Sequence, residues 1–457
     1  MPREFKVLVV GAGMAGLMLG HLLERANIQF EIYERAEELR PLGSAMGFGA
    51  NILALFEQIG IYEDFKKVSK EVFGTAFVDD NHRQTAEIGG RFLAEKFGYA
   101  YRIFSRPDLM KVLLSRVPAH KIHMGKKLVD LVQDDEKVTL TFADGTTATG
   151  DLVVGADGGY STTREHLYKW LEEKGTLPAI DREPMTFGFY NLLGTTNPMD
   201  PAKYPVLAEE EGKIIILHRS NSRHAIQTFA VPGNRFAWNV TCHIASNFGY
   251  DSKVSSTTDW GTEATDAMIE EVREFNAPFG GKMKDFIDAT PRESISRVKL
   301  EEKMFRSWYG GRVILVGDAC HKMVPSAGQG AVNAFQDAAV LVNNLYDIPD
   351  RPTGADLEAA FASHYEERYP NAVIAFEISQ QQSVLIQGQT LFHRIMRWIV
   401  SHTIPQYLQE RTIDRVNSYR PQVSFLPMVP DKGVFGVQPR KVSKRYQEEL
   451  SAGAQAL

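Results

Sequence analysis

The chain has 457 residues, which is enough for two or three domains of about 100–200 residues each, and 44% of its residues are hydrophobic, as in an ordinary globular protein. Its 57 acidic and 51 basic residues give a formal net charge of −6, which argues against a nucleic-acid-binding protein, since that function needs a basic face. Cys242 and Cys320 match no metal-ligand spacing, so we expect free thiols in a reducing, cytoplasmic setting and no metal site.

The amino-terminal segment predicts a βαβ unit of the Rossmann type, with a strand over Phe5–Val10, a helix over Ala15–Arg25 and a strand over Gln29–Tyr33. A second helix is expected over about Asn51–Ile59. A third is expected over about Pro107–Arg116, where a proline in the first turn costs no hydrogen bond. These elements are typical of an α/β domain.

The next segments predict β-structure. Lys137–Phe142 alternates apolar and polar residues and is followed by a turn, which predicts a hairpin whose return ends in the apolar run Leu152–Val154. Three short β-rich runs separated by turn residues then predict an antiparallel sheet with one solvated or ligand-facing side. These runs are Ile214–Leu217, His224–Phe229 and Phe236–His243, and a helix over about Thr262–Phe275 follows them.

The chain then returns to an α/β pattern, with a strand over Arg312–Val316 and a helix from about Ala331 to Leu345. Leu357–Gln387 is expected to be helical with a break or kink at Pro370. We therefore expect residues 1–180 and 301–350 to form one nucleotide-binding domain, interrupted by a β-rich domain at 181–300. A helical region and a surface-wrapping tail are expected over 351–457.

One segment is a candidate for membrane contact. Thr390–Tyr407 is the most nearly apolar stretch of sufficient length, but it contains charged residues, histidines and a proline. No apolar run reaches the roughly 18–20 residues that cross a bilayer. We expect this segment to form an amphipathic helix that packs on its own protein, with no integral membrane segment.

The first chemical motif is Gly11-Ala12-Gly13-Met14-Ala15-Gly16, between the first strand and its helix. The first glycine permits a tight turn, the second lets a pyrophosphate approach the backbone, and the third lets helix and strand pack closely. Glu34, followed by Arg35, ends the second strand near the roughly 20-residue spacing at which an acid binds ribose hydroxyls. The alternative, a helix cap in an unrelated α/β protein, does not explain Glu34.

Two further motifs follow buried strands. In Gly155-Ala156-Asp157-Gly158-Gly159, with Arg164 downstream, the pattern taken alone is typical of a turn with an aspartate N-cap. The third motif runs from Gly317-Asp318 through Pro325 to Gly328-Gln329-Gly330, before the helix near Ala331. Asp318 can accept a hydrogen bond from a ribitol hydroxyl, and the helix dipole can stabilise negative charge on a reduced flavin. For His321 in this loop the simpler interpretation is a side chain that holds the backbone.

Together the three motifs resemble those of the group A (single-component) flavoprotein monooxygenases, the family of para-hydroxybenzoate hydroxylase. The third motif looks closest to the fungal branch that epoxidises or hydroxylates terpenoid and polyketide intermediates. The resemblance implies an α/β fold with a Rossmann-type FAD-binding domain, an inserted antiparallel β-sheet substrate domain and a helical C-terminal region. It also implies that NAD(P)H reduces FAD and that O₂ then oxygenates a hydrophobic small molecule.

The resemblance places a set of residues on FAD. They are Gly11, Gly13, Ala15, Gly16, Glu34, Arg35, Gly47, Arg106, Asp157, Arg164, Asp318, Pro325, Gly328, Gly330 and Ala331. Some fungal relatives also carry a catalytic tyrosine beside a tryptophan in the inserted sheet, but the matching stretch here is Phe236-Ala237-Trp238. Tyr190 is a possible substitute, although a tyrosine in a β-rich segment is more often a packing residue.

Two other functions remain open at this point: a flavin oxidoreductase that does not oxygenate, and a flavin-binding redox switch with little turnover. The halogenase signature Trp-x-Trp-x-Ile-Pro is absent from the sequence. The identity of the substrate, the choice between NADPH and NADH and the oligomeric state are not encoded in these motifs.

Overall fold

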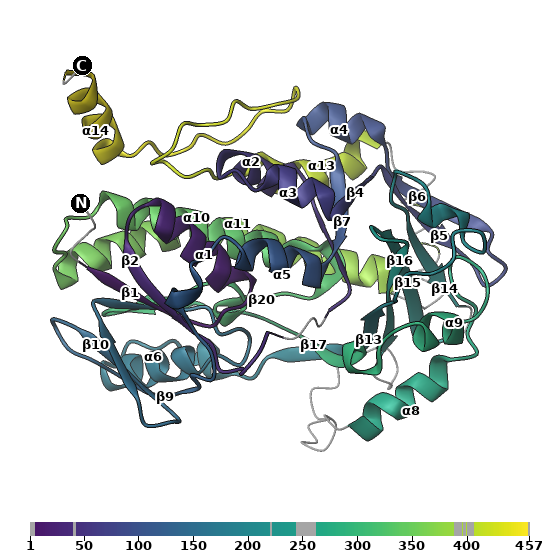
Figure 1. The fold of residues 1–457 in the computed structure, drawn as a ribbon, viewed down its shortest axis with the longest axis horizontal. Helices are drawn as coiled ribbons and strands as arrows, with labels where there is room; N and C mark the ends of the chain where they lie inside the picture. The colour runs from purple at the N-terminus through teal and green to yellow at the C-terminus, as the bar shows by residue number, and fades with distance from the viewer. Residues whose placement is uncertain are drawn as a thin grey trace.

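A mainly parallel sheet, ordered β18-β19-β12-β1-β2-β8, organises the nucleotide-binding half of the computed structural model (Figure 1). The structure describes residues 5–39, 43–219, 222–243, 262–387 and 406–455, and the single positions 395 and 399. The strands are β1 (Lys6–Val10), β2 (Gln29–Tyr33), β8 (Ile122–His123), β12 (Leu152–Gly155), β18 (Tyr309–Gly310) and β19 (Val313–Leu315). Only β18 is antiparallel to its neighbour among the described pairs of this sheet.

Both faces of this sheet are covered, as a parallel sheet requires. Val7 and Val9 of β1 pack into a core beneath α1 (Met14–Arg25) and α10 (Gln329–Asp347), whereas Leu8 and Val10 belong to a second buried cluster on the other side. That second side carries α6 (Thr162–Glu173) and a small sheet of β9 (Leu128–Gln133), β10 (Val138–Phe142) and β11 (Thr147–Gly150). In Figure 1 the long helix α11 (Gly354–Gln387) runs beside α10.

The second large element is an eight-stranded sheet, ordered β20-β17-β13-β16-β15-β14-β5-β6. Its strands are β5 (Gly74–Val78), β6 (Gln84–Gly89), β13 (Thr186–Thr195), β14 (Ile214–His218), β15 (His224–Val231), β16 (Arg235–His243), β17 (Ser296–Met304) and β20 (His321–Lys322). One face is covered by α8 (Thr262–Val272) and α9 (Met283–Asp288). The sheet therefore extends beyond the predicted insertion at 181–300, because β5 and β6 join it from earlier in the chain. The pairing of β5 with β14 is parallel.

A further, three-stranded sheet is ordered β3-β7-β4. It consists of β3 (Ala45–Phe48), β4 (Ser69–Val72) and β7 (Tyr101–Ser105), and α2 (Ala50–Gln58) follows β3. The strand β7 leads directly into α5 (Arg106–Leu114), which has proline in its first turn as expected. The remaining helices in this region are α3 (Tyr62–Lys67) and α4 (Arg91–Phe97).

The fold class, the βαβ unit and the β-rich runs were predicted correctly. The hairpin return was predicted wrongly, and of the break or kink expected at Pro370 the break is absent. The hairpin return does not continue into Leu152: β11 ends at Gly150, and β12 joins the parallel sheet. Asp151 makes this separation, because its side chain and its N–H both bond to the backbone of Lys6. The predicted break at Pro370 is also absent, since α11 continues through it with Ala372 and Ala375 buried in the core.

The carboxyl-terminal tail is more deeply packed than a surface-wrapping segment. After α13 (Gln406–Ser418), Val423 and Phe425 enter the core beneath α2. The side-chain amide of Gln58 donates to the Val423 carbonyl and accepts the Val423 N–H. The tail ends in α14 (Lys444–Gln455). Most of the predicted helix at Thr390–Tyr407 lies outside the described residues. Within the described ranges, no helix is long and apolar enough to cross a membrane.

Candidate functional site

The three glycines of the first motif have different surroundings. Gly11 has φ of 103°, and a Cβ there would lie 2.5 Å from the Ala156 carbonyl oxygen. A Cβ on Gly16 would overlap the Gly11 carbonyl oxygen, so helix α1 can pack this closely on β1 only with glycine. A Cβ on Gly13 would meet nothing within 4 Å. The open space is thus at the position where a pyrophosphate is expected at the start of α1.

Glu34 is held beside this loop. Its Oε2 accepts the backbone N–H of Ala12 at 2.8 Å and its Oε1 accepts the N–H of Ala36 at 3.0 Å. A carboxylate has about four lone-pair positions, so two remain for the hydroxyls of a ribose. Arg35 is exposed next to it. The Glu34 carboxylate is therefore fixed in place with acceptor positions left for further hydrogen bonds.

The second motif braces the third. The Asp157 carboxylate accepts the Thr163 N–H and hydroxyl at 3.0 Å each and also the hydroxyl of Ser161, which itself caps α6. The buried guanidinium of Arg164 donates to the carbonyls of Gly159 at 2.7 Å and Ala319 at 2.9 Å. Arg164 therefore ties the loop after β12 to the residue that follows Asp318. Both side chains fix backbone here. The interpretation of the motif as a turn held by Asp157 is close to this arrangement, although the N-cap of α6 is Ser161. The bonds of Arg164 were not apparent from the sequence.

A buried ionic cluster centred on Asp337 of α10 holds the loop of the third motif. Asp337 on α10 is fully buried and accepts the Gly317 N–H at 2.8 Å, His321 Nε2 at 2.6 Å and Arg368 Nε at 2.8 Å. Burial alone would raise the pKa of Asp337, but the neighbouring His321 and Arg368 hold it below its usual range. The interpretation of His321 as a side chain that holds the loop agrees with this contact.

The same cluster contains a group of potential metal ligands, Cys320, His321 and Asp337. Two of the three already bond to each other, and Asp337 also carries Arg368. Burial raises the pKa of the Cys320 thiol well above its usual value, so this sulfur is a poor metal ligand. The chemistry of this donor set does not favour a metal ion.

Asp318 itself follows strand β19 in the third motif. It is half-buried, and no hydrogen bond to its carboxylate is found among the described residues. Burial lowers the pKa of the Arg106 guanidinium, and the charge of Asp318 opposes that shift. These two residues are far apart in sequence but close enough in the fold to interact electrostatically. A Cβ on Gly330 would lie 4.0 Å from Asp318 Oδ1. An available carboxylate beside glycine backbone fits the ribitol of FAD.

A cavity of about 350 Å³ adjoins these loops and falls within the range of about 300–1,000 Å³ typical of small-molecule sites. One wall is the sheet, with Thr75, Phe77, Ile214, Ile216, Gln227 and Phe229. Another wall is the backbone near Gly47, Pro325 and Gly328, where the flavin ring is expected. Among the described residues that line the cavity there is no Asp, Glu, Lys, Arg or His. The arrangement can hold a neutral, largely apolar molecule.

Tyr190 lies on the opposite face of the sheet from this cavity. Gln227, which lines the cavity, pairs with Asn239, and Asn239 pairs with Leu193. Side chains alternate along a strand, so odd-numbered residues of β13 face the cavity side and Tyr190 faces the cluster beneath α8 and α9. The Arg297 guanidinium stacks 3.8 Å from its ring centroid. The expectation that Tyr190 replaces the missing catalytic tyrosine therefore receives no support.

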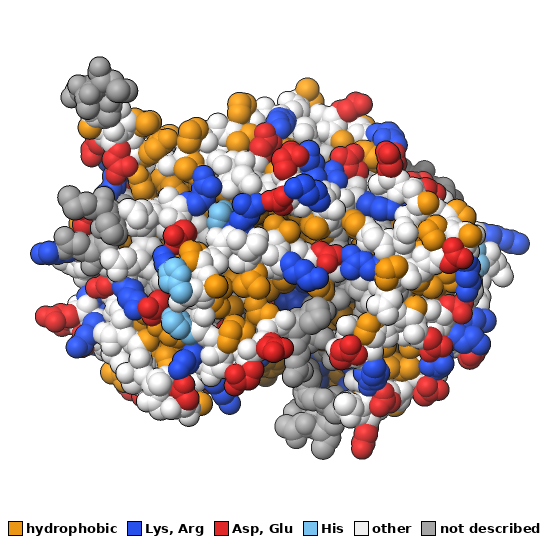
Figure 2. Space-filling view, viewed as in Figure 1, with side chains coloured by type: hydrophobic (Ala, Val, Ile, Leu, Met, Phe, Trp, Pro, Cys, Tyr) orange, Lys and Arg blue, Asp and Glu red, His pale blue; other side chains and the backbone are white. Residues whose placement is uncertain are grey.

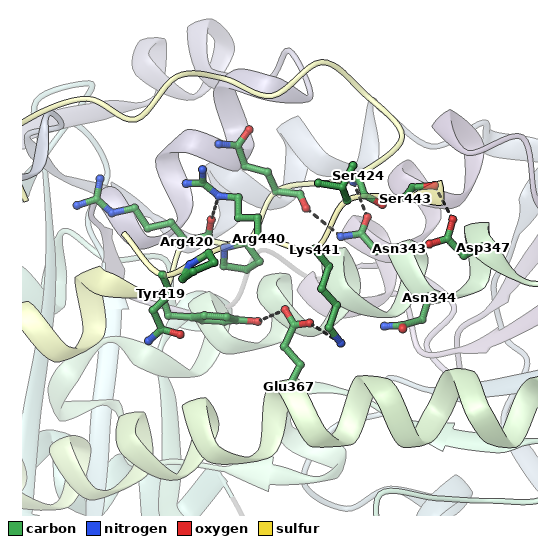
Figure 3. Close-up of a pocket in the computed structure, with 15 residues that line it drawn as sticks. Asn343, Asn344, Asp347, Glu367, Tyr419, Arg420, Ser424, Arg440, Lys441 and Ser443 are labelled. Atoms are coloured by element: carbon green, nitrogen blue, oxygen red, sulfur yellow. Dashed lines mark hydrogen bonds and ion pairs between the residues drawn. The ribbon is translucent and has the colours of Figure 1, made fainter. Parts of the chain in front are cut away.

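A second, smaller pocket lies where the tail crosses α10 and α11 (Figure 3). The Tyr419 hydroxyl donates to Glu367 at 3.0 Å and Lys441 pairs with the same carboxylate at 3.2 Å. Its volume of about 40 Å³ is enough for about one water molecule.

On the face shown in Figure 2, basic and acidic side chains are interspersed without a basic stripe.

The sequence was compared with known families and proteins. The family model described as "FAD binding domain" matches residues 4–234 and 262–351. The FAD-dependent monooxygenase penE of Penicillium thymicola is 30% identical over 368 residues, covering 79% of this chain and 72% of that protein. The FAD-dependent monooxygenase esdpE of Penicillium shearii is 27% identical over 409 residues, covering 86% of this chain and 81% of that protein.

Solved structures share the fold. Klebsiella pneumoniae HpxO complexed with FAD and uric acid matches with a TM-score of 0.72 and 20% identity, over 90% of this chain and 96% of that one. A salicylate hydroxylase substrate complex matches with a TM-score of 0.64 and 20% identity, over 90% and 97% of the two chains. These identities are low, so the likeness extends to the fold alone.

Proposed function

This chain belongs to the FAD binding domain family and is an oxidoreductase of the FAD-dependent monooxygenase group; on this premise we propose that it uses NAD(P)H and O₂ to hydroxylate or epoxidise a neutral, hydrophobic small molecule. The substrate class that we propose is terpenoid, polyketide or aromatic. The observation that carries the proposal is the cavity beside the third motif, whose described lining residues include no charged side chain.

The residues for FAD fall into two groups. Gly13 and the first N–H groups of α1 would hold the pyrophosphate, and Glu34 would hold the adenosine ribose. Asp318, with Arg106 near it, would hold the ribitol, and the positive end of α10 would face the flavin ring. When bound, FAD supplies the two-electron redox chemistry that links NAD(P)H to O₂.

The proposed role of the cavity is to limit the access of water and to select the substrate. The apolar side chains of the sheet wall, such as Phe77, Ile216 and Phe229, would limit the access of water to the reacting atoms, and this limits the wasteful release of reduced oxygen species. A lining without charges also disfavours an anionic substrate, because an unpaired charge loses its hydration on entering. Only one glycine-rich dinucleotide motif is apparent in the sequence, so we propose that NAD(P)H approaches the flavin without a Rossmann domain of its own.

The test begins with the cofactor and ends with the product. The purified protein is expected to be yellow and to release FAD, not FMN, when denatured. A panel of neutral terpenoid, polyketide and aromatic compounds is then screened for NAD(P)H oxidation with O₂ uptake, and products made in ¹⁸O₂ are weighed by mass spectrometry. A product heavier by one ¹⁸O atom supports the proposal. Turnover of NAD(P)H with a reduced, unoxygenated product would instead establish a non-oxygenating reductase, and negligible turnover with every compound would favour a redox switch.

A further inference from the structure

Tyr101 occupies the boundary between the expected flavin position and the cavity. It is the first residue of β7, and its ring packs directly on the backbone of Gly47 in β3. A Cβ on Gly47 would overlap the Oη, Cε1 and Cζ atoms of Tyr101, and a Cβ on Gly328 would lie 3.5 Å from the same Oη. The phenol therefore lies next to two of the glycines expected to contact FAD.

The strand register explains this position. Gly47 pairs with Ile103 in the antiparallel β3–β7 ladder, and residues two apart on a strand point to the same face. Tyr101 thus lies diagonally from Gly47 and can cover its backbone only because glycine has no side chain. Gly49 adds to this platform, since a Cβ there would lie 3.5 Å from Tyr101 Cδ2. Part of the requirement for glycine at position 47 therefore comes from Tyr101.

The Tyr101 hydroxyl faces an environment without charges. The side chain lines the cavity and is 41% exposed, and no hydrogen bond of its hydroxyl is found within the described ranges. Its exposed surface adjoins the cavity, and desolvation by the surrounding protein raises the pKa of Tyr101 to about 12, so the phenol is neutral at physiological pH and can donate a hydrogen bond. In an apolar pocket a few such polar groups fix the orientation of the ligand.

We propose that Tyr101 is a substrate-binding residue whose phenol donates a hydrogen bond to a carbonyl or hydroxyl oxygen of a neutral, apolar substrate. This inference rests on the proposed function and deepens it, since it names a polar group that the substrate must carry. By fixing that oxygen at the flavin end of the cavity, Tyr101 determines which carbon of the substrate is presented for oxygenation.

The test uses two C15 bicyclic probes of matched shape, the enone nootkatone and the corresponding hydrocarbon valencene. Their dissociation constants for the FAD-loaded protein are measured by titration calorimetry and by the change in flavin absorbance. The wild-type protein is expected to prefer the enone by about three- to tenfold, the size of one net hydrogen bond. Tyr101→Phe keeps the ring on Gly47 and removes only the donor, so the preference is expected to disappear.

Tyr99→Phe is the matched control, because the Tyr99 hydroxyl already donates to Glu57 at 2.7 Å. This variant is expected to retain the preference for the enone. Melting temperature and FAD content of both variants show whether the packing on β3 is kept. An enone preference that survives in Tyr101→Phe would overturn the role of Tyr101, while NAD(P)H-dependent oxygenation would still support the proposed function. Failure of the wild-type protein to bind the enone, or to prefer it, would also overturn the inference.

Discussion

The carboxylate of Asp337 accepts the backbone N–H of Gly317 at 2.8 Å, so a fully buried charge holds the residue that precedes Asp318. Gly317 has φ of 63°, a conformation that favours glycine, and the strand β19 ends two residues before it. The same carboxylate pairs with Arg368 on α11. The geometry of the proposed ribitol contact is therefore set in part by Asp337 on α10 and Arg368 on α11, two residues that lie outside the three motifs.

Removing the Asp337 carboxylate should be costly, because it leaves Arg368 as an uncompensated buried charge. Breaking such a pair from one side typically costs about 3–5 kcal/mol. We expect Asp337→Ala to lower the free energy of unfolding by about this amount in urea titrations. The control is Asp431→Ala, which removes the more exposed partner of Arg440 and should cost less than about 1 kcal/mol. Equal decreases in the free energy of unfolding for the two variants would mean that the buried cluster around Asp337 does not stabilise the loop of the third motif.

Substitution of Asp318 should affect FAD binding and not stability. Its carboxylate has no hydrogen bond among the described residues and is available to the cofactor. We expect Asp318→Ala to weaken FAD binding about ten- to a hundredfold, because a hydrogen bond to a charged group is worth roughly 1.5–3 kcal/mol. The melting temperature of the FAD-free protein should change little. Fluorescence titration of apoprotein with FAD measures the first effect. An unchanged affinity would show that the third motif has another role.

The local patterns predicted most of the nucleotide-binding half. Gly11, Gly16 and Glu34 have short-range signatures, and the structure brings them together around the turn between β1 and α1 with the expected close contacts. The eight-stranded sheet was predicted only in part, because the pairing of β5 with β14 joins segments far apart in the chain. No turn or spacing marks such a pair. Long-range pairing depends on tertiary packing, which a single sequence does not reveal.

The site was predicted less completely than the fold. Asp337 and Arg368 carry no motif, and only their meeting between α10 and α11 gives them a function. Tyr101 was missed for a similar reason: its partner Gly47 had been interpreted only as one of the residues expected to contact FAD. For Tyr190 a signal was available, since Leu192, two residues on, is apolar and shares its face.

Acid should destabilise the protein partly through His364. Burial lowers the pKa of His364 to about 3, with Arg368 and His321 also opposing its protonation while Asp337 favours it. The unfolded chain takes up this proton near pH 6.5, so stability is lost as the pH falls from about 6.5 towards 3, by at most about 1.4 kcal/mol per pH unit.

We expect His364→Leu to reduce the slope of unfolding free energy against pH by about one proton between pH 6.5 and 4.5. Urea titrations at several pH values measure it. Part of the slope should remain, because burial also lowers the pKa values of His21 and His224. The same slope in wild type and variant would indicate that His364 is protonated in the folded state.

The glycines of the first motif allow cofactor binding to be separated from folding. At Gly13 the backbone has φ of −73° and a Cβ would meet no atom within 4 Å, so Gly13→Ala should fold with a melting temperature close to that of the FAD-free wild type. The added methyl group would occupy the space expected for the pyrophosphate, and we expect FAD affinity to fall at least about tenfold, or about 1.4 kcal/mol.

Gly16→Ala places its Cβ on the Gly11 carbonyl oxygen and should destabilise the FAD-free protein itself, by about 1–3 kcal/mol as for overpacking. Thermal melts of both apoproteins, followed by FAD titration, distinguish the two effects. Normal FAD affinity in Gly13→Ala would place the pyrophosphate elsewhere, and an unchanged melt of Gly16→Ala would mean that α1 can move away from β1 at little cost.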